Sequence, residues 1–214
     1  MLTICGKDLP SEKISLHQAR CFKCGGNPPH PPGTLHPVDY FTPDEAMSIV
    51  LHTTDDKYYY LFYLLYETGA RIGEGLAVTK TDLKVESCEV GFWTEKAKPK
   101  AYRQIPVSSM LMAELFQYSR YIRGKHLFAV SYSSVIYNLR HSALRAGITR
   151  RVCSHMFRHG MIRNIIKDYS GSPTNALSYA AKIAGHKKIE TTMIYANSTE
   201  REAKDAYRKL LERM

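Results

Sequence analysis

The leucine- and tyrosine-rich stretch from Tyr58 to Glu67 most constrains the fold of this chain. It is apolar on nearly every side, so a helix formed by it must be surrounded by other elements. Gly69 follows shortly after it. Glycine commonly ends helices because it adopts the left-handed conformation without steric cost. The sequence therefore predicts a core helix that ends at a glycine cap, with Arg71 just beyond that rigid end.

The first helix of the main body is predicted from its capping residues. Thr42 suits the N-cap position, Pro43 the first helical position and Glu45 the reciprocal position of a capping box, so a helix is expected over about 43–51. Helical periodicity predicts five further helices after residue 108, over 109–122, 133–146, 154–169, 174–184 and 199–213.

Two segments in the middle of the chain favour β-structure. Residues 85–93 and 102–107 are the strand candidates, and the turn between them, 94–101, is rich in lysine and proline. They predict a small antiparallel hairpin with a positively charged tip. The expected fold class is therefore mainly α with a small antiparallel β-sheet (α+β).

Charge and composition narrow the choice of partner. The 214-residue chain has 30 Lys and Arg against 20 Asp and Glu, a net charge of +10, which favours a polyanionic partner such as nucleic acid or an anionic membrane surface. No apolar run approaches the roughly 20 residues that cross a bilayer, and the N-terminus lacks the apolar core of a secretory signal. We expect a soluble, cytoplasmic protein that does not enter membranes.

The N-terminal residues 1–37 differ in composition from the expected main domain, 38–214. They are rich in proline, which opposes both helix and sheet, so an arm or linker is expected. Cys21 and Cys24 form a CxxC pair that resembles half of a zinc knuckle. An isolated pair is more often incidental, so a structural zinc is the less favoured interpretation. The odd number of cysteines, five, argues against a disulfide framework.

Candidate catalytic residues occur in four short segments. The chain has no Asp-x-Asp motif or acidic cluster typical of a two-metal nuclease, which favours phosphate chemistry by Arg, Lys and His. Arg71 and Arg158 suit a phosphate clamp because guanidinium stays charged and binds phosphate in a bidentate manner. Tyr195 could act as the nucleophile, and a lysine near position 98 or a histidine as the proton donor.

Taken together, these segments resemble the tyrosine recombinase (phage integrase) family. The matching motifs are Thr68-Gly-Ala-Arg71-Ile-Gly-Glu74, His155-Met-Phe-Arg158-His159, and Gly185-His186 with Tyr195 nine residues after the histidine. Order and spacing both match, and the resemblance covers about residues 42–210.

The resemblance implies a role for each matched residue. Arg71 and Arg158 would clamp the scissile phosphate, His155 would transfer a proton, and Tyr195 would attack phosphorus. The product would be a covalent 3′-phosphotyrosyl enzyme with a free 5′-hydroxyl, formed without metal, ATP or another cofactor. His186 would hydrogen-bond the phosphate.

Two further residues receive supporting roles from the same resemblance. Glu74 would support Arg71. Lys98, counted back from the proline that ends the second strand, would protonate the leaving 5′-oxygen. Lys96 and Lys100 lie on the same turn and remain alternatives to Lys98.

The resemblance predicts a site-specific DNA recombinase or integrase that acts as a homodimer or homotetramer on DNA. Two alternatives stay open: a type IB topoisomerase-like enzyme, which would rejoin the original strand, and a non-catalytic DNA-binding protein on the same fold. Family members usually carry a separate helical clamp domain before the catalytic one, and fewer than 42 residues precede the first body helix here. A minimal recombinase, a clamp supplied by a partner and a catalytic fragment are all compatible with this.

Overall fold

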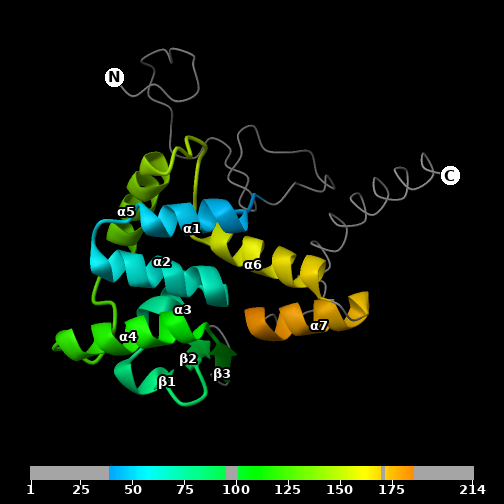
Figure 1. The fold of residues 1–214 in the computed structure, drawn as a ribbon, viewed down its shortest axis with the longest axis horizontal. Helices are drawn as coiled ribbons and strands as arrows, with labels where there is room; N and C mark the ends of the chain where they lie inside the picture. The colour runs from blue at the N-terminus through cyan, green and yellow to red at the C-terminus, as the bar shows by residue number, and fades with distance from the viewer. Residues whose placement is uncertain (1–38, 95–100, 170–171, 186–214) are drawn as a thin grey trace, which may run out of the picture. The chain divides into compact units, whose positions relative to one another are not determined.

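The computed structural model describes residues 39–94, 101–169 and 172–185 (Figure 1). The predicted arm with Cys21 and Cys24, and the helix expected over 199–213, lie outside the described residues. Nothing in the structure bears on the boundary predicted near residue 37.

Seven α-helices lie in the described part of the chain, and none of them is long and apolar enough to span a membrane. The helices expected from periodicity and capping are confirmed to within about two residues wherever the structure describes them. Three elements escaped prediction, namely the short helix α3, a 3₁₀ turn at Lys80–Asp82 and the two-residue strand β1 Leu83–Lys84. The helices are α1 Pro43–Leu51, α2 Asp56–Thr68, α3 Ile72–Leu76, α4 Ser109–Tyr121, α5 Tyr132–Arg145, α6 His155–Asp168 and α7 Pro173–Ala184.

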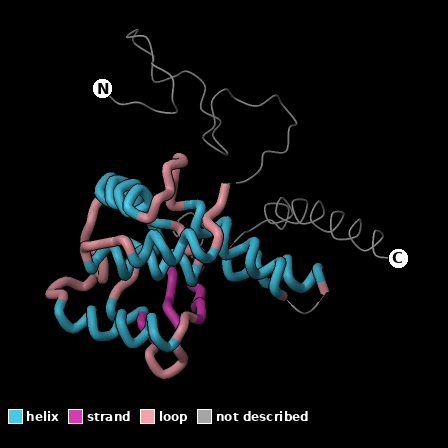
Figure 2. Tube along the Cα trace, turned by 45° about the horizontal axis from the view of Figure 1, so that its top comes forward, coloured by secondary structure: helices cyan, strands magenta, loops and turns pink. Residues whose placement is uncertain are grey.

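The sheet has three antiparallel strands in the order β1-β2-β3, seen beside the helices in Figure 2. They are β1 Leu83–Lys84, β2 Glu89–Thr94 and β3 Ala101–Pro106. The single strand expected over 85–93 is wrong at its start, because residues 85–88 form a turn between β1 and β2. Cys88 has a φ of 51°, which no regular strand adopts, and the side chain of Val85 is exposed.

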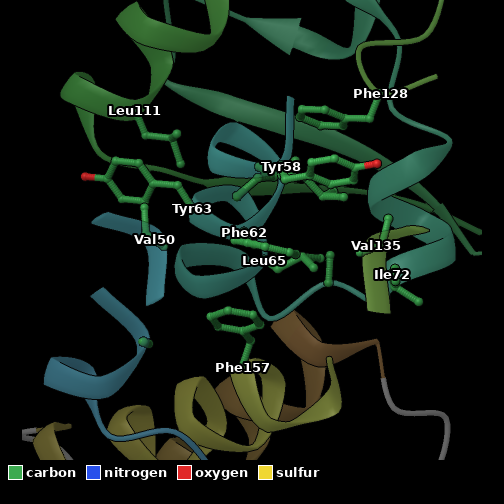
Figure 3. Close-up of a cluster of buried hydrophobic side chains, with 14 of the residues drawn as sticks. Val50, Tyr58, Phe62, Tyr63, Leu65, Ile72, Leu111, Phe128, Val135 and Phe157 are labelled. Carbon is green, nitrogen blue, oxygen red and sulfur yellow. The ribbon is translucent and has the colours of Figure 1, made fainter. Parts of the chain in front are cut away.

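Helix α2 lies at the centre of the core, as its composition predicts. Its residues Leu61, Phe62, Leu64 and Leu65 are all fully buried. It packs against α1, α3, α4, α5 and α6. Figure 3 shows Phe157 from α6 directed toward Phe62, and the two rings stack with centroids 6.0 Å apart. The first candidate motif therefore begins at the end of the most deeply buried helix.

Helix α6, which carries His155 and Arg158, is fixed to the segment before α1 by close backbone contact. The N–H of Phe41 donates to the carbonyl oxygen of Met156 at 3.2 Å. The rings of Phe41 and Phe157 lie 4.9 Å apart. At Gly160 the absence of a side chain lets the helix backbone approach the carbonyl oxygen of Phe41, because an added Cβ would overlap that oxygen. A glycine in this helix is thus a packing requirement.

We predict that Gly160→Ala destabilises the protein, although the same change in an open helix stabilises by up to about 1 kcal/mol. The added Cβ meets backbone, which cannot rotate away, so a loss of roughly 1–3 kcal/mol in unfolding free energy is expected by urea titration. Gly73→Ala in α3 is the matched control, since a Cβ there meets nothing within 4 Å. Equal stability of Gly160→Ala and wild type would contradict this account of α6 packing.

Candidate active site

Arg71 is placed by the rigid end of α2. Gly69 caps that helix in the left-handed conformation with a φ of 57°, and Arg71 then serves as the N-cap residue of α3. The main-chain N–H of Arg71 donates to Oε2 of Glu74 at 2.9 Å, and its Nη1 donates to Oε1 at 3.1 Å. About a third of the Arg71 side chain, 32%, stays exposed. Arg71 is therefore held at its base while part of its side chain remains open to solvent.

The carboxylate of Glu74 is buried between two guanidinium groups. Its side chain is only 5% exposed. Besides Arg71, it accepts hydrogen bonds from Arg103, at 3.2 Å from Nη1 to Oε1 and 2.7 Å from Nη2 to Oε2. Burial alone would raise the pKa of Glu74, but the hydrogen bonds and charge of Arg103, aided by Arg71, outweigh burial and hold that pKa below its ordinary value. Glu74 thus supports Arg71 as the resemblance implies, with a second arginine as partner.

Arg103 is the residue that sequence reasoning missed. Its Nε donates to the carbonyl oxygen of Ile183 at 3.2 Å, and its Nη1 donates to Oγ1 of Thr94 at 2.7 Å. A signal for it was available in the alternation of β3, where the neighbouring inward position, Ile105, is buried and positions 102 and 104 are exposed. A charged residue on the inward face of a strand requires a buried partner.

Arg158 joins the C-terminal ends of two helices. Its side chain is buried, and its Nη1 donates to the carbonyl oxygen of Gly69 at 2.9 Å while Nη2 donates to that of Ala184. These carbonyls end α2 and α7, where the helix dipoles favour a cation. Gly185 then caps α7 with a φ of 63°. Arg158 therefore ties together the two helix ends that precede Arg71 and His186 in the sequence.

His155 is the first residue of α6 and is exposed to solvent, whereas Arg158 on the same helix is buried. The ring centroids of His155 and His159 lie 6.3 Å apart. Of the six predicted catalytic residues, Arg71, His155 and Arg158 are described. Lys98, His186 and Tyr195 lie outside the described residues, and their placement stays a prediction.

The described residues contain no group of three His, Cys, Asp or Glu side chains that could hold a metal ion. Glu74 is paired with two arginines, and Arg158 is a further arginine, held by two main-chain carbonyls. What this arrangement offers chemically is a set of fixed cationic groups at the ends of buried helices, which suits an anionic oxygen ligand such as phosphate.

Comparison with known proteins assigns the family. The model of the phage integrase family matches residues 39–202, most of the chain. The chain belongs to the phage integrase family. Among relatives, tyrosine recombinase XerC of Xanthomonas campestris pv. campestris is 31% identical over 169 residues, which cover 72% of this chain and 49% of that protein. The chain thus spans about half the length of this member of the phage integrase family.

Solved structures show the same fold as this phage integrase family member. The XerA recombinase matches with a TM-score of 0.65 at 23% identity, covering 86% of this chain and 67% of that one. The XerH recombinase bound to its difH substrate in a pre-cleavage complex matches with a TM-score of 0.61 at 17% identity, covering 73% and 50%. The expected fold class, helices with a small antiparallel sheet, is confirmed.

We predict that the stabilisation supplied by ionised Glu74 is lost in acid. Because the pKa of Glu74 is lowered in the folded protein, the unfolded state binds more protons near the ordinary value of 4.5. The contribution is therefore fully present above that value and disappears as the pH falls through the folded pKa. Urea unfolding of wild type and Glu74→Gln should show a stability gap that is widest near neutral pH and narrows in acid. A gap that widens in acid would contradict the assignment.

Proposed function

We propose that this protein is a tyrosine-type site-specific recombinase, which cleaves and rejoins DNA strands through a covalent 3′-phosphotyrosyl intermediate. One observation carries the proposal. The buried guanidinium of Arg158 is hydrogen-bonded to the carbonyl of Gly69, two residues before Arg71. Two arginines that lie far apart in the sequence thus belong to one connected structure, as a two-arginine phosphate clamp requires.

In the proposed reaction the arginines bind the non-bridging oxygens of the scissile phosphate. Guanidinium remains charged at all working pH values, so Arg71 and Arg158 would stabilise the negative charge that builds on these oxygens in the transition state. Holding both on helix ends costs little reorganisation when the substrate arrives. His186 would add a further hydrogen bond to the same phosphate.

Proton transfer completes the proposed step. The Tyr195 oxygen attacks phosphorus, the bond from phosphorus to the 5′-oxygen breaks, and the leaving oxygen receives a proton from Lys98. Lys96 and Lys100 are the alternatives. His155, exposed at the start of α6, would take part in moving the proton of Tyr195. A 5′-hydroxyl from another strand reverses the step. The proposed reaction uses neither a metal ion nor a cofactor.

Double-stranded DNA is the proposed partner. The net charge of +10 favours binding to phosphate backbones. The XerH structure that shares this fold contains its difH substrate. We propose that two or four copies act together on paired sites inside the cell, because exchange of strands between duplexes needs one nucleophile for each strand cut.

We predict a covalent protein–DNA adduct that depends on Tyr195. Wild type and Tyr195→Phe are incubated with nicked suicide duplexes bearing candidate sites, from which the cut fragment diffuses away so that rejoining fails. Denaturing gels should show an adduct for wild type and none for Tyr195→Phe. Tyr179→Phe is the matched control, since Tyr179 is an exposed tyrosine on α7 and should leave the adduct yield unchanged.

The same proteins are also incubated with intact paired duplexes and with supercoiled plasmid, on which rejoining is possible, and three outcomes then separate the candidate activities. An adduct that resolves into strands exchanged between two duplexes supports recombination. Rejoining of the original strand alone, with relaxation of supercoiled plasmid by a monomer, would favour a topoisomerase-like activity. DNA binding without any adduct would favour a non-catalytic binding protein and would overturn the proposal.

A further inference from the structure

Arg103 contacts three segments that lead to or support proposed catalytic residues. Its side chain binds Glu74, which holds Arg71, and also Thr94 at the end of β2 and the carbonyl of Ile183 near the end of α7. In the sequence Thr94 precedes the lysine-rich turn with Lys98, and Ile183 lies three residues before His186.

We propose that Arg103 is a positioning residue for strand cleavage, which sets the orientation of Arg71 through Glu74 and fixes the end of α7 relative to the sheet. The inference rests on the proposed function, because it concerns the rate of the same phosphoryl transfer.

Two arginines set the geometry around Glu74. Arg103 pairs with both carboxylate oxygens, Nη1 with Oε1 and Nη2 with Oε2, and this bidentate pairing fixes the plane of the carboxylate. Arg71 binds the same two oxygens, through its side chain and its main-chain N–H. A carboxylate free to rotate would leave the Arg71 fork without a fixed direction. Arg103 therefore determines how Arg71 presents its remaining donors.

Arg103 also contacts the end of α7. The Nε of Arg103 donates to Ile183, and the backbone of Gly185 lies against the same guanidinium, since a Cβ added at Gly185 would be 3.3 Å from its Cζ. The ring of Phe92, the cross-strand neighbour of Arg103, lies 5.6 Å from Cζ. The guanidinium is thus held between the sheet and the end of α7, and it fixes the spacing between them.

The hydrogen bonds suit Arg103 to positioning and Arg71 to direct contact with phosphate. All three guanidinium nitrogens of Arg103 donate within the protein, whereas the Arg71 side chain donates through Nη1 and is 32% exposed. Arg103 already donates to Glu74, Thr94 and Ile183, all within the protein. Arg71 is the more open of the two and is the better placed to meet a phosphate. Lysine could keep the charge next to Glu74, but a single ammonium lacks the planar fork that makes these contacts together.

The test separates binding from cleavage in Arg103→Lys. The dissociation constant for intact duplex, the thermal midpoint and the single-turnover rate of adduct formation on a nicked duplex are measured for wild type and variant. We expect a rate about 100-fold lower, with a dissociation constant changed less than about three-fold. Arg150→Lys is the matched control, because Arg150 likewise binds a glutamate, Glu45, and a main-chain carbonyl, that of Tyr40. It should cleave at nearly the wild-type rate.

A double variant tests whether Arg103 acts through Glu74. Glu74→Gln removes the charge that pairs with Arg103, so adding Arg103→Lys to it should slow cleavage by less than about ten-fold further. A full 100-fold loss repeated in that background, or a wild-type rate in Arg103→Lys alone, would overturn the inference. A wild type that binds DNA but forms no adduct would instead overturn the proposed function, and the inference with it. If Arg150→Lys lost as much cleavage rate and as much thermal stability as Arg103→Lys, the effect at Arg103 would be a general loss of structure. Arg103 would then not be a positioning residue.

Discussion

The buried carboxylate of Glu74 is the interaction on which the rest of the candidate site depends. An ionised carboxylate out of water is strongly destabilising unless it is paired and hydrogen-bonded. Here Arg71 and Arg103 supply that pairing, and they come from two different parts of the fold, the start of α3 and the strand β3. The carboxylate therefore links the sheet to the helix ends. Replacing Arg103 would remove two of the four hydrogen bonds to this buried carboxylate, and replacing the Arg71 side chain would remove one, so stability and site geometry are coupled at this point.

The candidate site also shows how a rigid core can fix the position of reactive groups. Helix α2 is buried over 61–65, and Arg71 follows two residues after its glycine cap. Arg158 crosses from α6 to the C-terminal carbonyls of α2 and α7, where the helix dipoles favour its charge. Arg158 is thus stabilised by main-chain carbonyl groups, and the side chain of Arg71 by the carboxylate of Glu74. Such preorganisation is what lowers the barrier for phosphoryl transfer, because the charges need no rearrangement during reaction.

Most of the helices could be predicted from local sequence, whereas hydrogen bonds between residues far apart in the sequence could not. The Thr42–Glu45 capping box and the glycine cap at Gly69 lie where local sequence placed them, and α7 ends at Ala184 as expected. The turn at 85–88 was missed because Val85 suits a strand, while the backbone reverses at Cys88. Arg71, His155 and Arg158 were predicted from motifs, but the partners of Arg103, Glu74 and Ile183, come from distant segments. Only the folded chain brings those partners together.

The most direct measurement of the central claim is a crystal structure of Tyr195→Phe bound to an uncleaved duplex containing its site. The account predicts a scissile phosphate within about 3 Å of donors from both Arg71 and Arg158, with Arg103 still paired to Glu74 and Ile183. A phosphate bound elsewhere on the protein, or one contacted by Arg103 in place of Arg71, would contradict it.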